Sequence, residues 1–96
     1  MKKIYVVEWD EIEFGWGTRT EGYSFHLSLE EAEEYKTLKT EQTENFRWEG
    51  DQAKVHEVND EKYEIIKKRI EASEEKLGIK SGQLNFTEAI NEICGR

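Results

Sequence analysis

The order of local patterns along the chain most strongly constrains its fold. Runs rich in β-branched and aromatic residues at Ile4–Trp9, Ile12–Gly17 and Tyr23–Leu27 predict a strand, an irregular hairpin and a second strand. A helical pattern follows, then a third strand-like run, then two more helical patterns. This β-β-α-β-α-α order lacks the alternation of parallel sheets. It predicts an α+β fold, with a small antiparallel sheet of about three strands covered on one side by two to three helices.

The first helix is marked by a capping box at Ser28 and Glu31, in which the serine oxygen accepts the glutamate amide proton. Good helix formers then continue to about Glu44. The apolar face of this helix is thin, which is typical of a helix that lies on a sheet. Residues 45–52 show no period and are predicted to form a loop, and residues 53–58 to form the third strand.

The second helix has the clearest pattern in the chain. Asn59 or Asp60 can cap its start, and Gly78 can end it in the left-handed conformation of a C′ residue. Its apolar residues repeat at intervals of 3, 4 and 7, at Tyr63, Ile66, Ile70 and Leu77.

A short last helix is predicted with Thr87 as its cap and Gly95 at its end. A helix this short is unstable alone, so it must dock on the second helix or on a partner chain. Its apolar residues share one face: Phe86, Ala89, Ile90, Ile93 and Cys94.

Length and composition predict one domain over residues 1–96. The chain has no proline, no Gly/Ser-rich linker and no long apolar run, and its aromatic residues supply material for a core. A core of this size is marginal, so association into a homo-oligomer is expected.

The acidity of the chain argues against general binding of DNA or RNA. Lys and Arg total 14 against 22 Asp and Glu, a net charge of −8, and the acids are spread over both halves. The surface as a whole therefore cannot neutralise a phosphate backbone. Cys94 is the single cysteine, and the chain shows neither a secretion signal nor about 20 consecutive apolar residues. These features predict a cytoplasmic protein without membrane contact.

Two segments combine arginine with aromatic residues. One is the glycine-punctuated hairpin around Arg19, and the other is the loop Phe46–Trp48, which places Arg47 between two rings. A guanidinium can form bidentate hydrogen bonds to a phosphate or carboxylate, while an aromatic ring can stack on a base. The candidate ligand-binding residues are Trp16, Arg19, Tyr23, Ser24, His26, Arg47 and Trp48.

These segments also have a purely structural interpretation. The hairpin aromatics can be cross-strand pairs whose glycines only satisfy the turn, and the loop rings can close the open end of a small core. Nothing in the sequence places the two segments together. The glutamates of the first helix have two interpretations as well. In one, their negative charge near the start of the helix interacts favourably with the helix dipole. In the other, they form an acidic face that mimics phosphates.

Catalytic and metal-binding patterns are weak. His26 and His56 lack the spacing of metal motifs, and zinc prefers closed sets of nitrogen and sulfur ligands. Ser24 and His26 share a strand face, but no nucleophile elbow surrounds the serine. Cys94 lies on an apolar helix face and is predicted to be a core residue. We therefore expect a protein without catalytic residues, metal or cofactor.

The first third of the chain resembles a group of small phage and prophage proteins. Thr20-Glu21 stands where that pattern leads us to expect a proline and an aspartate, so the hairpin turn can differ. The resemblance is carried by Ile4-Tyr5-Val6-Val7-Glu8-Trp9, by Gly17-x-Arg19-x-x-Gly22-Tyr23-Ser24-x-His26 and by Ser28-x-Glu30-x-Ala32.

What the resemblance implies is antagonism of host defence from within the bacterial cytoplasm. Small early phage proteins often bind a defence protein or sequester a nucleotide-derived immune signal, and both are non-catalytic roles. In a sponge for such a signal, Arg19 and Arg47 would hold phosphates, and Ser24 or His26 would hydrogen-bond the ligand. The rings of Trp16, Tyr23 or Trp48 would stack on its base.

Two other functions stay open. One is an acidic inhibitor that binds a host defence protein or a nucleic-acid-binding protein. The other is a small nucleotide hydrolase that uses Ser24 or His26.

Overall fold

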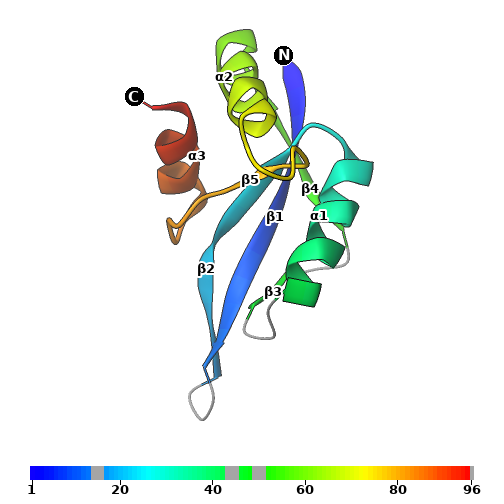
Figure 1. Ribbon diagram of the computed structural model, residues 1–96. Helices are drawn as coiled ribbons and strands as arrows, with labels where there is room; N and C mark the ends of the chain where they lie inside the picture. Colours follow the sequence, from blue (N-terminus) through cyan, green and yellow to red (C-terminus); the bar gives the residue numbers. More distant parts are fainter. Residues whose placement is uncertain (14–16, 43–45, 49–51, 96) are drawn as a thin grey trace.

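Strand β1 (Lys2–Glu13) is the centre of an antiparallel sheet in the computed structural model, which describes residues 1–13, 17–42, 46–48 and 52–95 (Figure 1). One edge of β1 pairs with β2 (Gly17–His26). The other edge pairs with β4 (Lys54–Val58) along its first half and with β3 (Phe46–Trp48) along its second half. A short β5 (Ile79–Lys80) pairs with β2. The predicted antiparallel α+β fold is confirmed, with a sheet four strands wide because β3 and β4 share one edge.

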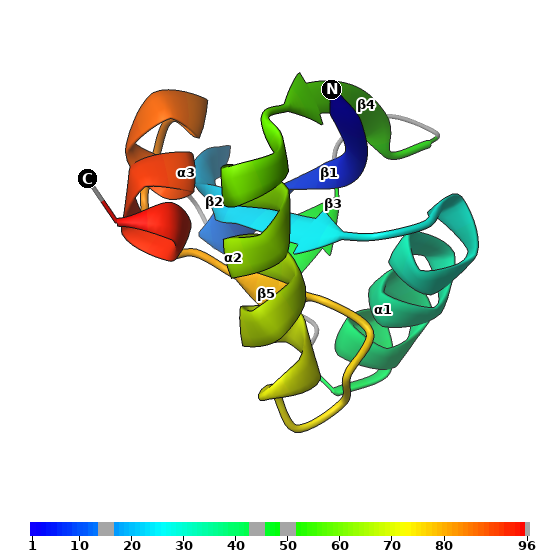
Figure 2. The ribbon, with the colours of Figure 1, turned by 90° about the horizontal axis from the view of Figure 1, so that it is seen from above.

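Both faces of β1 are buried, so the expectation that the helices cover one side was wrong. Ile4 and Val6 pack against α2 (Asp60–Glu71) and α3 (Phe86–Cys94). Val7 and Trp9 point the other way and pack against α1 (Leu29–Gln42). Figure 2 shows α1 set apart from α2 and α3. The uninterrupted apolar run at the start of β1 is typical of a strand that is buried on both faces.

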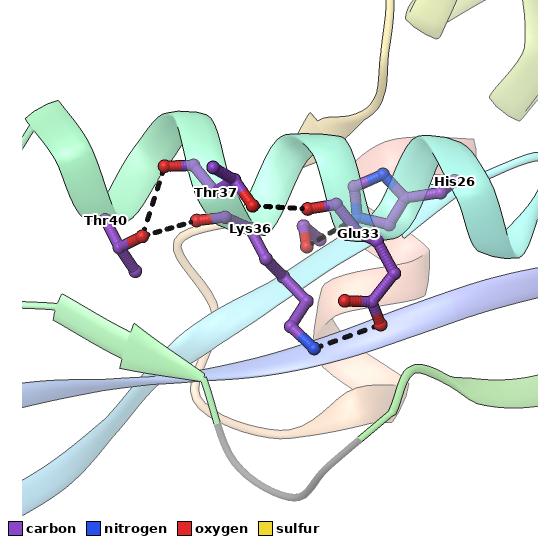
Figure 3. Close-up of polar contacts among 6 residues, drawn as sticks. His26, Glu33, Lys36, Thr37 and Thr40 are labelled. Carbon is purple, nitrogen blue, oxygen red and sulfur yellow. Dashed lines mark hydrogen bonds and ion pairs between the residues drawn. The ribbon is translucent and has the colours of Figure 1, made fainter.

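Helix α1 begins as the capping box predicts. The Glu31 amide donates to Ser28 Oγ over 3.1 Å, and the serine hydroxyl donates to the Glu31 carboxylate. The helix covers the sheet with Ala32, Tyr35 and the stem of Lys36, which is buried although it is charged. Figure 3 shows Lys36 reaching from α1 toward the sheet, with its ammonium 3.2 Å from the Glu33 carboxylate. The expected end of this helix at Glu44 lies outside the described residues.

Helix α2 begins at its predicted cap but ends earlier than predicted. Asn59 Oδ1 accepts the Lys62 amide proton over 2.8 Å, which confirms the cap. The helix stops at Glu71, so the extension to Leu77 and the C′ role of Gly78 were wrong.

The side chain of Ser73 helps to end α2. Its hydroxyl donates to the Ile70 carbonyl over 2.6 Å and accepts the Lys76 amide proton, so it occupies backbone groups that another helical turn would use. The chain then crosses to the opposite side of the sheet, where Leu77 packs with the α1 cluster. A continued helix would have kept Leu77 on the wrong face.

Two further expectations were also wrong. The segment Phe46–Trp48 is a strand rather than a loop, because it supplies partners to the stretch of β1 that extends beyond β4. Asn85 caps α3 in place of Thr87, with its Oδ1 accepting the Glu88 amide proton over 2.8 Å. The α3 helix itself and its glycine end at Gly95 are confirmed.

Gly78 is required by a close approach between two segments. A Cβ at this position would lie 2.2 Å from Nδ1 of His26 and 2.8 Å from the Phe25 carbonyl oxygen. Gly82, four residues later, has nothing within 4 Å of such a Cβ. An alanine side chain therefore does not fit at position 78 but fits at position 82.

We expect Gly78→Ala to lower the free energy of unfolding by about 3 kcal/mol, because the added methyl group forces His26 or the strand to move. Urea denaturation measures this loss. Gly82→Ala is the matched control and should change stability by less than about 1 kcal/mol. Equal stability of the two variants would show that the packing around His26 is looser than described.

Candidate functional site

Ser24 and His26, two of the predicted ligand-binding residues, are fully buried beneath α1. The Trp9 indole donates to Ser24 Oγ over 2.7 Å, and Ser24 Oγ lies 2.8 Å from Nε2 of His26. His26 Nδ1 lies 2.9 Å from the Leu77 carbonyl oxygen. All their polar side-chain atoms therefore have protein partners. In this conformation neither residue can reach a ligand.

The directions of these hydrogen bonds follow from chemistry. A carbonyl only accepts, so Nδ1 of His26 carries the proton and donates to Leu77. Nε2 must then accept from the Ser24 hydroxyl, which itself accepts from the Trp9 indole. Burial lowers the pKa of His26 to about 4, although its bond to the Leu77 carbonyl acts in the opposite sense. The ring is therefore neutral at pH 7, as this chain of hydrogen bonds requires.

Because of His26, we expect the free energy of unfolding to decrease as the pH falls. Its pKa of about 4 in the folded protein lies below the ordinary 6.5, so the folded state binds fewer protons between these values. The contribution, about 3 kcal/mol, is present above pH 6.5 and is lost as the pH falls toward 4. The difference between the urea-unfolding profiles of wild type and His26→Gln isolates it from the titration of carboxylates.

A titration by NMR tests the same point without a variant. The His26 ring protons should keep their neutral chemical shifts down to about pH 5. A midpoint near 6.5 would contradict the buried, neutral ring.

Apart from Tyr23 and Trp16, the remaining predicted residues belong to the far half of the hairpin and to β3. Arg19 lies opposite Glu11 across the β1–β2 pair, and Arg47 lies opposite Asp10 across the β1–β3 pair. The structure thus brings the two segments to opposite edges of one strand. Trp16 lies outside the described residues.

Register assigns the two arginine positions to different faces of the sheet. Glu11 and Asp10 are consecutive in β1 and therefore lie on opposite faces of the sheet, and so do the positions paired with them. Position 47 falls on the face covered by α2 and α3, which also carries Tyr23. Positions 19 and 48 fall on the α1 face.

A groove on the α2/α3 face has the side chains expected of a ligand site. It consists of two hollows that share the stacked rings of His56 and Phe86, whose centroids are 4.3 Å apart and whose planes differ by 18°. We call it the His56–Phe86 groove. The smaller hollow, of about 290 Å³, is lined by Val6, Glu8, Tyr23, Lys54, His56 and Phe86. The larger, of about 430 Å³, also meets the first turns of both helices, with Asn59, Lys62, Thr87, Ile90 and Asn91 among its lining residues.

Each hollow contains a lysine, Lys54 in the smaller and Lys62 in the larger. Within the described part of the chain neither lysine forms an ion pair. Burial and the nearby Lys54 lower the pKa of His56, so its ring is neutral at pH 7. The groove therefore combines a neutral ring pair with two lysines, and the carboxylates of Glu8 and Glu57 also line it.

Tyr23 is held by the strands around it. Its hydroxyl donates to Glu8 over 3.2 Å, and burial followed by the Glu8 charge raises the pKa of the phenol. Its ring packs edge-on against Phe86, with 5.8 Å between the centroids. Tyr23 is the one predicted site residue whose described side chain lines this groove.

Sequence reasoning missed most of the groove. Phe86 reads as one more apolar residue of an amphipathic helix, and His56 as an isolated histidine in a strand. Their stacking depends on α3 docking against the sheet so that the Phe86 ring reaches His56, a contact between residues 30 positions apart for which the sequence has no local pattern.

The cysteine and the potential metal ligands are two further places where chemistry could occur. Burial raises the pKa of the Cys94 thiol, with Lys62 and Arg69 opposing it, so the reactive thiolate is disfavoured. Among the residues that the structure describes, no group of three metal-ligating side chains occurs.

The chain matches no family model, no curated protein and no solved structure. Among the described residues no helix is long and apolar enough to cross a membrane.

Proposed function

We propose that this protein is a non-catalytic binder of a nucleotide-derived small molecule, held in the His56–Phe86 groove. The observation that carries the proposal is the stacked ring pair with a lysine in each of the two hollows that share it. In a chain with 22 acids and 14 bases, two lysines without an ion pair in one groove support binding of an anion there, between the carboxylates of Glu8 and Glu57 that also line it.

The chemistry of a nucleotide suits this arrangement. A flat base would pack against the half-buried rings of His56 and Phe86, and a phosphate would be held by Lys54 or Lys62. The hollow of about 430 Å³ is within the range of small-ligand sites. Asn59 and Asn91 line it and could hydrogen-bond base or sugar.

Sequestration rather than turnover fits the proposal best. The Ser24–His26 pair that a hydrolase would use is buried and fully hydrogen-bonded. A nucleophile that cannot meet its substrate gives no reaction. In the setting that the resemblance to phage proteins implies, capture of a nucleotide signal would antagonise host immunity, and a homo-oligomer would present several copies of the groove.

Calorimetric titration with cyclic di-AMP, cyclic di-GMP, ADP-ribose and ATP tests the proposal. We expect at least one of them to bind, and Lys54→Ala or Lys62→Ala to weaken it about tenfold or more, through the loss of a charge-assisted hydrogen bond. Lys68→Ala, at an exposed position of α2, is the matched control and should leave affinity unchanged.

Three results would contradict the proposal in different ways. No heat with any of the four compounds would remove nucleotide binding from the candidates. Affinity lost in Arg19→Ala but kept in the two groove variants would move the site to the α1 face. Conversion of the bound compound during incubation, measured by chromatography, would show an enzyme.

A further inference from the structure

A second groove lies on the outer surface of α1, well separated in the fold from the His56–Phe86 groove. It is a hollow of about 440 Å³, and we call it the α1 groove. Leu38 and Leu77, both half-buried, supply its apolar surface. The complete lining is Glu33, Glu34, Thr37, Leu38, Glu41 and Leu77.

Of the three carboxylates along this groove, only Glu33 is balanced by a lysine of the same helix. Lys36 is buried and pairs with Glu33 over 3.2 Å (Figure 3). Lys39 pairs with Glu75 over 2.7 Å and lies above the Tyr35 ring. Within the described part of the chain, Glu34 and Glu41 form no ion pair. The groove therefore combines two leucines with carboxylates, two of which have no ion pair among the described residues.

We propose that the α1 groove binds a basic amphipathic segment of another protein. An aliphatic side chain of the partner would enter between Leu38 and Leu77, and its Lys or Arg residues would meet Glu34 and Glu41. The negative charge disfavours nucleic acid and anionic membranes. The net charge of −8 on each copy also disfavours a second molecule of this protein as the occupant.

This surface is independent of the nucleotide proposal, because α1 and the His56–Phe86 groove lie on opposite faces of the sheet. The two proposals can therefore fail separately.

Fluorescence anisotropy tests the proposal with a labelled 14-residue peptide of Leu and Lys in helical amphipathic order. The full chain should bind this peptide, and the Glu34→Lys/Glu41→Lys double variant should bind it at least about tenfold more weakly. Glu61→Lys/Glu64→Lys, at exposed positions of α2, is the matched control and should bind as wild type does. A peptide with Glu in place of Lys should not bind.

Leu38→Ser separates the apolar contribution from the electrostatic one. It should weaken binding while leaving the dependence on salt unchanged, because the carboxylates remain. Far-UV circular dichroism checks that each variant keeps its fold.

The proposal is overturned if the basic peptide does not bind, or if the α1 and α2 double variants lose affinity equally, which would indicate unspecific attraction. A scrambled Leu/Lys peptide that binds as well as the amphipathic one would also overturn it. So would a change of native mass in Glu34→Lys/Glu41→Lys, because it would identify a second copy as the occupant.

Discussion

The fold depends on β1 pairing along both edges while it is buried on both faces. Ile4 and Val6 belong to the core beneath α2 and α3, and Val7 and Trp9 to the core beneath α1. Because successive side chains of a strand alternate, a slip of one residue would exchange these two sets. The pairing of β1 with β2, β3 and β4 fixes that register along its whole length. The register of β1 decides which side chains face each helix, and so it also fixes where the helices and both grooves lie.

The α1 side of the sheet is held by polar as well as apolar contacts. Trp9, Ser24, His26 and the Leu77 carbonyl form one connected series of hydrogen bonds between strand, strand and connecting segment. A buried network is favourable only when every member is satisfied, and no described buried side-chain atom lacks a partner. These contacts bring the segment after α2 across the sheet edge, where Leu77 becomes part of the α1 groove. Thus residues that read as a ligand site in the sequence fix the connection between the two cores.

Local patterns predicted the elements well and their arrangement less well. The caps at Ser28 and Asn59 and the apolar face of α3 are short-range features, and the structure has them. The early end of α2 and the strand at Phe46–Trp48 depend on tertiary contacts that propensity does not contain. The Ile4–Trp9 run predicted a strand, but its uninterrupted apolar start, which is typical of a strand covered on both faces, was not used to place the helices. For the candidate site, the sequence singled out Tyr23, which lines the groove, but not the His56–Phe86 stack, which forms only when the start of α3 docks against the sheet.

We infer that ligand chemistry lies on the α2/α3 face of the sheet, while the α1 face carries structure and a separate surface for a partner. Amide chemical shifts of isotope-labelled protein report this directly, since each backbone position gives its own signal. Titration with cyclic di-AMP, ADP-ribose and ATP in turn should perturb Lys54, His56, Lys62 and Phe86 as a contiguous group, and leave Arg19 and Glu34 unmoved. Shifts confined to the strand around Arg19, or to the acidic face of α1, would contradict the account.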